Sequence, residues 1–386
     1  MPKLTWGTVD YYISRLTSTE NNPPQRIDIC NQNLTDNDAI RLADALLHCS
    51  EDSSSSRRGS TLKMLRLRGN NITSKGFLAI CEAIGGVADS TSALEELDMG
   101  YNAVVSNMDD FAFAMYLLFS AAPNLKHLDL TGNKIGLLND GGMNLIGEIL
   151  SLNTHYGGGG LETLNLSHNF LCDRAAIHLA EAMMILDFES LTRLNLSLNY
   201  IGVRGAEALA KVVASNVPLE HLLLTYNSLG DSGAELFASA LKTNDTLLEL
   251  NLGYNRITSV GMKALRMAVY DTTSLNSLVT SNHTVSIFFY GYCVDEDFNY
   301  QGCTKDQLHE MDQILRINAL PKHYPGLPPV PQLKLAFRLR QSFDMKYFQH
   351  IDRKHMPEVL KFVSAHVGGD KLFQITKEMP LAVCAN

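Results

Sequence analysis

The sequence has no long apolar run. Among its 386 residues, no stretch reaches the roughly 18 consecutive apolar residues that suggest a membrane-spanning helix. The first residues, Met1 to Gly7, also lack the apolar centre of a secretory signal peptide. The longest apolar stretch, Phe111 to Phe119, is short enough to be a helix that packs on its neighbours. We therefore expect a protein without a membrane segment, located in the cytoplasm, with the nucleus as an open alternative.

The sequence also lacks an even number of cysteines and an excess of positive charge. The seven cysteines are scattered along the chain and their number is odd. This usage favours free thiols in a reducing compartment over a disulfide framework. The formal net charge is −9. Because nucleic acids and anionic membranes attract basic surfaces, this charge argues against both as partners.

No set of catalytic or cofactor-binding residues stands at a meaningful spacing. The glycine run at residues 157–160 is not followed by the Lys-Ser/Thr pair of a phosphate-binding loop. Cys293, Cys303 and His309 could supply metal ligands, but the cysteine spacing matches no common zinc site. We therefore predict no catalytic, cofactor-binding or metal site, and a protein that is not an enzyme.

A repeated pattern of leucine and asparagine dominates the sequence. Leu161, Leu164, Leu166, Asn169 and Leu171 follow the spacing LxxLxLxxNxL, and the regular copies start 30, 28 and 28 residues apart. Several copies in one register indicate a repeat architecture. Further copies, some of them looser, begin at Leu62, Leu94, Leu125, Leu191, Leu219 and Leu247.

Each repeat is predicted to contain one strand and one helix. Leu164 and Leu166 are two residues apart, so their side chains point to the same face of a short strand. Residues 173–186 then carry apolar residues at helical spacing. Asn169 lies where the chain leaves the strand, and its side chain is expected to bond backbone groups of neighbouring turns. A single repeat cannot bury both of its faces, so the copies must stack.

The segments that follow two of the strands support a particular kind of repeat. Ile201 to Ala210 and Leu229 to Ala238 repeat with a period of 28 residues, which leaves room for a full helix. This pattern resembles the ribonuclease-inhibitor-like leucine-rich repeats, which also occur in NOD-like receptors and in the Ran GTPase-activating protein. The resemblance covers residues 25–285. It implies an α/β fold, a right-handed horseshoe-shaped solenoid with a parallel sheet on the concave side and helices on the convex side.

The predicted solenoid, with about nine repeats over residues 25–285, is flanked by two cap regions. Residues 1–24 are predicted to form an N-terminal helical cap, with Thr5 or Thr8 as its N-cap. Residues 286–386 are predicted to form a mostly helical C-terminal cap region with a proline-rich connector at 321–331.

Two further segments carry specific expectations. The last repeat is expected to begin at Leu275, with His283 in the asparagine position. The polar loop at residues 50–60 ends in Arg57-Arg58-Gly59-Ser60, which makes Ser60 a candidate phosphorylation site; the alternative is a solvated loop without a regulatory role.

Strand alternation predicts which side chains can meet a partner. Residues between the core leucines point away from the core, toward the concave side. Their charge is mixed, and Arg and Tyr are frequent anchors of protein interfaces. The predicted partner-binding residues are Arg66, Arg68, Glu96, Asp98, Tyr101, His127, Asp129, Arg193, His221, Tyr226, Glu249 and Tyr254.

These features predict a monomeric scaffold that binds a protein partner through the concave strand face and the adjacent loops. The sequence does not identify the partner. One alternative is a GTPase-activating protein of the Ran type, which shares the repeat length, although the long acidic tail of that type is missing. Another is a sensor or effector subunit in innate-immune-like signalling, although no nucleotide-binding segment accompanies the repeats.

Overall fold

The computed structural model describes residues 7–18, 24–51, 62–85, 92–137, 160–185, 190–271 and 281–288. The chain divides into two compact units, Met1–Ser228 and Leu229–Asn386. The candidate phosphorylation site Ser60, the proline-rich connector and nearly all of the predicted C-terminal cap region lie outside the described residues. The predicted domain boundaries at 24 and 285 therefore stay predictions.

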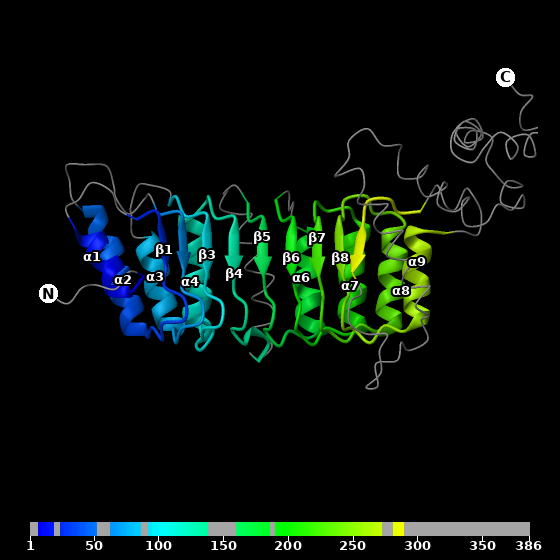
Figure 1. The fold of residues 1–386 in the computed structure, drawn as a ribbon, viewed down its shortest axis with the longest axis horizontal. Helices are drawn as coiled ribbons and strands as arrows, with labels where there is room; N and C mark the ends of the chain where they lie inside the picture. Colours follow the sequence, from blue (N-terminus) through cyan, green and yellow to red (C-terminus); the bar gives the residue numbers. More distant parts are fainter. Residues whose placement is uncertain are drawn as a thin grey trace, which may run out of the picture. The chain divides into compact units, whose positions relative to one another are not determined.

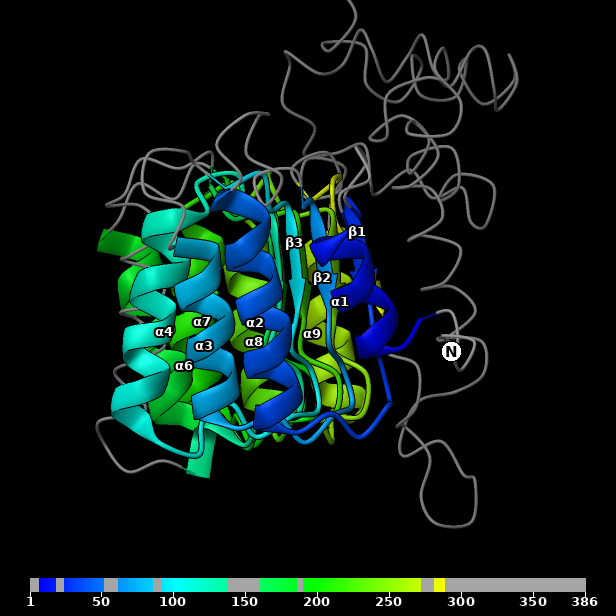
Figure 2. The same cartoon turned by 90° about the vertical axis from the view of Figure 1, so that its left-hand side faces the viewer.

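The first unit alternates short strands with helices, and the strands pair in parallel with their chain neighbours. Figure 1 shows β1 to β7 side by side in chain order, and Figure 2 shows helices α2, α3 and α4 in a layer beside β1, β2 and β3. The elements are α1 (Val9–Thr17), β1 (Arg26–Asp28), α2 (Asp36–Glu51), β2 (Met64–Arg66), α3 (Ser74–Gly85), β3 (Glu96–Asp98), α4 (Met108–Ala121), β4 (His127–Asp129), the 3-10 helix η2 (Ile135–Leu137), β5 (Thr163–Asn165), α6 (Asp173–Ile185), β6 (Arg193–Asn195), α7 (Val203–Ala214) and β7 (His221–Leu223).

The second unit contains the same alternation. Its described elements are α8 (Gly230–Leu241), β8 (Glu249–Asn251), α9 (Ser259–Val269) and β9 (Ser286–Phe288). Strand β9 pairs in parallel with β8, and Ile287 lies opposite Leu250. The prediction that the last repeat begins at Leu275, with His283 in the asparagine position, is wrong. Asn282 instead closes the turn before the last strand, because its Oδ1 accepts a hydrogen bond from the Val285 amide at 3.0 Å.

The leucine positions of the repeat form the core. The central residue of each strand is buried, as Leu164, Leu194 and Leu222 illustrate with none of their surface exposed. The apolar stretch Phe111 to Phe119 is a helix, as predicted, and belongs to α4. Among the described residues, no helix is long and apolar enough to cross a membrane.

Helix α1 begins where the sequence predicts the N-terminal cap. Thr8 is its N-cap and accepts a hydrogen bond from the Tyr11 amide at 3.3 Å, which satisfies one of the free amides of the first turn. Leu16 is buried, and an ion pair of 2.6 Å joins Asp10 to Arg41 of α2.

The repeated asparagines hold neighbouring turns together. Asn199 is buried; its Oδ1 accepts hydrogen bonds from the amides of Asn169 (3.0 Å) and Leu171 (2.9 Å). Its Nδ2 donates to the carbonyls of Leu166 (3.1 Å) and Leu196 (2.9 Å). These backbone groups have no partner in the strand ladder, so the asparagine removes the cost of burying them. The expectation stated for Asn169 holds at this position of several repeats.

Aspartates at the start of some helices make a second cross-repeat connection, which the sequence analysis missed. Asp36 Oδ1 accepts from the amides of Thr73 (2.7 Å) and Gly76 (3.2 Å) in the next repeat. A Cβ at Gly76 would lie 2.6 Å from that oxygen, so the glycine allows the close approach. The same arrangement is found at Asp173 with Gly202 and Gly205, and at Asp231 with Thr258 and Gly261.

Candidate functional site

The strand face is formed by the first and third residues of each strand, which flank the buried central residue. Of the predicted binding residues, Glu96 lies opposite His127, and Arg193 lies opposite His221. A second row on the first unit contains Arg66, Asp98 and Asp129, and these also lie opposite one another. Arg68, Tyr101 and Tyr226 follow the strands in the adjoining turns. Glu249 lies on β8 and Tyr254 in the turn after it, both in the second unit.

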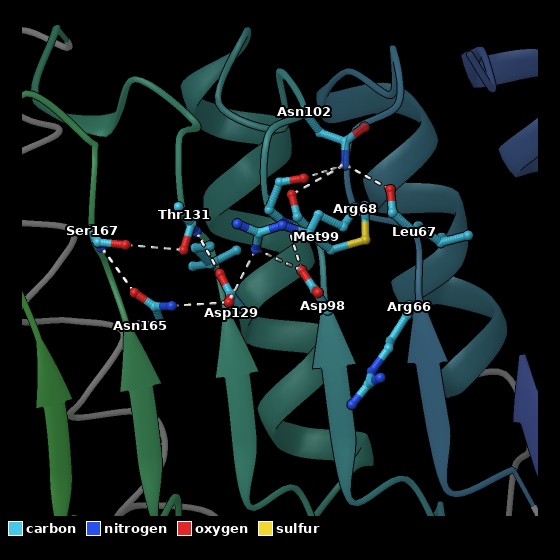
Figure 3. Close-up of polar contacts among 12 residues, drawn as sticks. Arg66, Leu67, Arg68, Asp98, Met99, Asn102, Asp129, Thr131, Asn165 and Ser167 are labelled. Carbon is cyan, nitrogen blue, oxygen red and sulfur yellow. Dashed lines mark hydrogen bonds and ion pairs between the residues drawn. The ribbon is translucent and has the colours of Figure 1, made fainter. Parts of the chain in front are cut away.

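Five of the predicted residues form two neighbouring groups of ion pairs, which we together call the charged cluster: Arg66 with Glu96, and Arg68 with Asp98 and Asp129. The Nε of Arg66 donates to Glu96 at 2.6 Å. The Arg68 guanidinium lies 3.3 Å from Asp129 and 3.7 Å from Asp98, so it bridges two successive strands (Figure 3). The basic and acidic positions read from the sequence therefore compensate each other.

Backbone and amide groups complete the charged cluster. Asp98 Oδ1 accepts from the Gly100 amide at 2.9 Å, and Asp129 Oδ1 accepts from the Thr131 amide at 2.8 Å. The other oxygen of Asp129 accepts from the Asn165 side chain at 2.9 Å, as Figure 3 shows. These bonds hold both carboxylates in fixed directions, so Arg68 meets a preformed acidic pair.

The electrostatics of the charged cluster are uneven. Burial raises the pKa of the Asp98 carboxyl, and the nearby charge of Asp129 adds to this effect, while the Gly100 amide and the two arginines oppose it. The hydrogen bond to Glu96 raises the pKa of the Arg66 guanidinium. Burial thus disfavours the charged form of Asp98.

The ring of Tyr101 closes the charged cluster on the turn side. The Arg68 guanidinium carbon lies 4.7 Å from the centre of this ring, which is a cation–π contact. A Cβ at Gly132 would lie 2.6 Å from the ring, and a Cβ at Gly100 would lie 2.5 Å from the Arg68 guanidinium. The two glycines therefore provide the space that the tyrosine and the arginine occupy.

The residue before the repeated asparagine has a left-handed backbone in most repeats. Tyr101 (φ +50°), His168 (+56°), Leu198 (+56°) and Tyr226 (+58°) share this conformation, as does Gly132 (+69°). Such angles are uncommon outside glycine and cost free energy, so the surrounding turn must impose them. The bulky members of this position project at the edge of the sheet.

A line of rings continues from Tyr101 along this edge. Tyr101 lies 5.6 Å from His168, His168 lies 6.1 Å from Phe170, and Phe170 lies 5.8 Å from Tyr200, measured between ring centres. Tyr200 keeps 63% of its surface exposed and Tyr101 keeps 43%. With the exposed side chains of the neighbouring turns, we call this set the aromatic edge: Tyr101, His168, Phe170, Leu198, Tyr200 and Tyr226.

Of the aromatic edge, Tyr101 and Tyr226 are among the predicted binding residues, and His168, Phe170, Leu198 and Tyr200 are not. Phe170 and Tyr200 occupy the template position between the asparagine and the last apolar residue, where strand alternation gives no prediction. A signal was present, because this column holds aromatic residues in two consecutive repeats and Asn71, Ala103 and Lys134 in earlier ones. The remaining predicted residues, His127, Arg193 and His221, lie on the strand face but outside the charged cluster.

The candidate metal ligands Cys293, Cys303 and His309 lie outside the described residues. Among the described residues, no group of three or more His, Cys, Asp or Glu side chains could hold a metal ion. Burial, together with a hydrogen bond to Asp28, raises the pKa of the Cys30 thiol to about 11. Because the thiolate is the reactive form, Cys30 is a poor nucleophile at neutral pH.

Comparisons with solved structures give low identities. Leiomodin-1 Actin-Binding Site 2 is 14% identical, with 52% of this chain and 95% of that chain covered and a TM-score of 0.35. A TDR receptor is 14% identical, covers 72% of this chain and 36% of its own, and gives a TM-score of 0.36. The Rad7 and Elc1 complex in yeast is 17% identical, with 72% of each chain covered and a TM-score of 0.39.

Sequence comparison identifies the repeat. No curated protein matches the chain. A family model described as Leucine Rich repeat matches residues 60–81, 121–138, 189–210, 215–238 and 243–265. These stretches contain β2, β4, β6, β7 and β8, each of which has its central leucine buried. The chain therefore contains leucine-rich repeats at these positions, and such repeats indicate a scaffold for protein interaction.

Proposed function

We propose that this protein binds a partner protein through the aromatic edge, with the charged cluster beside it fixing the orientation of the partner. The observation that carries the proposal is the unbroken series of contacts from Arg68 through Tyr101 and His168 to Tyr200. This series places large exposed rings in a row on a rigid frame. Tyr and Arg are the side chains that most often dominate the binding energy of an interface.

Binding through the aromatic edge would cost little conformational entropy. A tyrosine side chain has few rotatable bonds, and contact with a neighbouring ring fixes it further before a partner arrives. Burying the exposed part of Tyr200 then removes apolar surface from water at a small cost in conformational entropy. The paired charges nearby are better suited to favouring one orientation and rejecting partners of the wrong charge.

The experiment compares two tyrosines of similar surroundings. Tyr200 lies against Phe170, and Tyr116 on α4 stacks on Phe113 with ring centres 6.3 Å apart; both tyrosines are exposed. The full chain is used to capture its partner, and the dissociation constant of that complex is then measured with Tyr200→Ala and with Tyr116→Ala. We expect Tyr200→Ala to weaken binding by about tenfold or more, as for an interface anchor, and Tyr116→Ala to leave it unchanged.

The opposite ranking would contradict the proposal. If Tyr116→Ala weakens the complex and Tyr200→Ala does not, while both variants unfold at the wild-type urea concentration, the partner binds the helix layer. Equal affinities for all three proteins would exclude the aromatic edge.

The remaining features of the proposal come from composition. We propose a monomeric, non-enzymatic protein of the cytoplasm or nucleus, whose partner is a protein rather than a nucleic acid or a membrane. The net charge of −9 argues against nucleic acids and anionic membranes as partners, and the scattered cysteines favour a reducing compartment. The alternatives of a Ran-type GTPase-activating protein and of an immune sensor share the repeat, but no contact among the described residues favours either.

A further inference from the structure

A pocket of about 410 Å³ lies where α1 meets the beginning of the strand face. It is separate from the aromatic edge. Its volume falls within the range of about 300–1,000 Å³ that is typical of ligand pockets. The side chains that determine its chemistry are Tyr11, Tyr12, Arg15, Arg26, Asp28 and Arg66.

The lining of this pocket is positively charged in a chain that is negative as a whole. Three arginines and one aspartate line it, and Glu96, which pairs with Arg66 from outside the lining, reduces the excess to one positive charge, whereas the chain has a net charge of −9. In a concave site, charges of one sign focus their field on the enclosed space. An anion is therefore the ligand that this pocket favours.

Arg26 of the pocket differs from the two arginines of the charged cluster, Arg66 and Arg68. Arg68 lies between Asp98 and Asp129 and is compensated by both. Within the described ranges, Arg26 has no carboxylate within ion-pair distance, and it is exposed. Arg66 pairs with Glu96 through Nε at 2.6 Å and with Asp28 through Nη1 at 4.0 Å. The whole guanidinium of Arg26 and the Nη2 of Arg66 can therefore donate to a ligand.

Besides the charged residues, the lining of the pocket contains aromatic and apolar side chains. Tyr11 and Tyr12 lie with ring centres 5.3 Å apart in an edge-to-face arrangement, and Pro24 and Met64 line the pocket as well. Arginine recognises carboxylates and phosphates through paired hydrogen bonds. A phosphate monoester carries a charge of about −1.5 to −2 at neutral pH and has three strong acceptor oxygens, so it can accept hydrogen bonds from two arginines at once.

We propose that this pocket binds a phosphate monoester carried on an aromatic or apolar body. Arg26 and Arg66 donate hydrogen bonds to the phosphate oxygens, and the two tyrosines with Pro24 and Met64 contact the attached body. The phosphate has two sources, a phosphorylated side chain of a partner protein or a small phosphate ester. Binding in this pocket does not depend on the aromatic edge, so the two proposals can fail separately.

The test uses three small probes on the full chain, with binding measured by calorimetry or by NMR titration. Phenyl phosphate has the aromatic body and the double charge, phenyl sulfate has the same shape with a single charge, and N-acetyl-phosphotyrosine amide adds a peptide backbone. We expect phenyl phosphate to bind more tightly than phenyl sulfate. Tighter binding of the phosphotyrosine amide indicates a partner protein as the source, and equal binding indicates a small ester.

Variants then locate the site. Arg26→Gln removes the exposed arginine of the pocket, and Arg204→Gln removes an exposed arginine of α7 far along the chain from it. We expect Arg26→Gln to weaken phenyl phosphate binding roughly tenfold, which is the effect of losing a hydrogen bond to a charged group, and Arg204→Gln to have no effect. Arg26→Lys should recover part of the binding because it restores the charge.

The proposal is overturned by either of two results. Phenyl sulfate and phenyl phosphate binding equally would exclude recognition of the double charge. Equal weakening by Arg26→Gln and Arg204→Gln, at unchanged circular dichroism, would show that the probes respond to the overall charge of the protein and not to this pocket.

Discussion

The charged cluster and the aromatic edge are neighbours on the first unit, and they present their surfaces to a partner in opposite ways. In the charged cluster, arginines and carboxylates satisfy one another, as Arg66 does with Glu96 and Arg68 with Asp129. In the aromatic edge, the rings contact each other, but Tyr200 and Tyr101 keep large parts of their surfaces exposed. A partner that covers the charged cluster must remove water from charges that are already paired, which gains little. A partner that covers the aromatic edge buries apolar surface, so the two regions are suited to orientation and to affinity, respectively.

The largest effect is expected from removing the hydrogen bonds of Asn199, which hold the turns that carry the aromatic edge. Asn199→Ala leaves the amides of Asn169 and Leu171 and the Leu166 carbonyl without their side-chain partner, while the Leu196 carbonyl keeps the Nδ2 of Asn227. Each buried polar group left unpaired costs about 1–3 kcal/mol, so we expect a loss of roughly 3–5 kcal/mol in the free energy of unfolding. Urea denaturation followed by circular dichroism measures this loss.

A surface asparagine provides the control for this variant. Asn124 is exposed and donates one hydrogen bond, to the Ser92 carbonyl at 3.0 Å. Asn124→Ala should cost less than about 1 kcal/mol, because water can replace the lost partner. Similar losses for the two variants would show that the repeated asparagine does not carry the cross-repeat connection.

The fold could be predicted from the sequence because the same pattern of leucine and asparagine positions recurs in many copies along the chain. Leu164, Leu194 and Leu222 stand at the same template position, and all three are buried strand centres. The last repeat was placed incorrectly because the chain between β8 and β9 is longer than the 28-residue period. Asn282 there bonds the Leu241 carbonyl and closes a turn, a role that the template does not contain.

The candidate site could be predicted only in part. Alternation correctly places Arg66 and Asp98 on the strand face, since it depends on neighbours in the chain. The pairing of Arg68 with Asp129 joins residues two strands apart, and it depends on the length of the arginine side chain and on the space over Gly100. The spacing of residues in the sequence does not show which side chains reach across strands. The pairing of the arginines with the carboxylates in the charged cluster was therefore not predicted.

A smaller effect is expected from displacing the ring of Tyr101. This ring belongs to the aromatic edge and also contacts Arg68 of the charged cluster. Gly132→Ala adds a Cβ that would lie 2.6 Å from this ring at a backbone φ of +69°. We expect a loss of about 1–2 kcal/mol in the free energy of unfolding, from backbone strain and from displacement of the ring. The NMR signals of His168 should also shift, because its neighbour moves.

Gly230→Ala is the matched control for Gly132→Ala. Gly230 has a similar φ of +62°, but a Cβ there would have open space around it. This variant therefore measures the backbone strain alone. If both variants lose the same free energy and the His168 signals do not move in Gly132→Ala, the ring of Tyr101 is not held by contact with Gly132.

The uneven electrostatics of the charged cluster predict a dependence on pH. The folded protein raises the pKa of Asp98 above its usual value near 3.8, so the unfolded chain loses this proton first as the pH rises. The native state then holds more protons than the unfolded state, and stability falls with rising pH in the window just above 3.8. Asp98→Asn removes this contribution. We expect the stability of the variant relative to the wild type to rise between the acidic side of this window and neutral pH.

Urea denaturation of both proteins across the same pH range measures the difference. The asparagine keeps an oxygen that can accept the Gly100 amide, so the local turn is preserved. A stability difference that stays constant with pH would show that burial does not disfavour the charge of Asp98.

The smallest effect is expected for ion pairs that lie on the strand side but outside the charged cluster. Lys63 and Glu95 are 2.8 Å apart, and their side chains are 52% and 44% exposed. Because water and salt screen such pairs, Lys63→Ala should change the free energy of unfolding by less than about 0.5 kcal/mol. Arg68→Ala should cost more, since it leaves the buried carboxylate of Asp98 without its compensating charge. Measuring both variants at low and high salt sharpens the contrast: only the effect of Lys63→Ala should vanish as salt is added, and equal effects would mean that the charged cluster is an ordinary solvated surface.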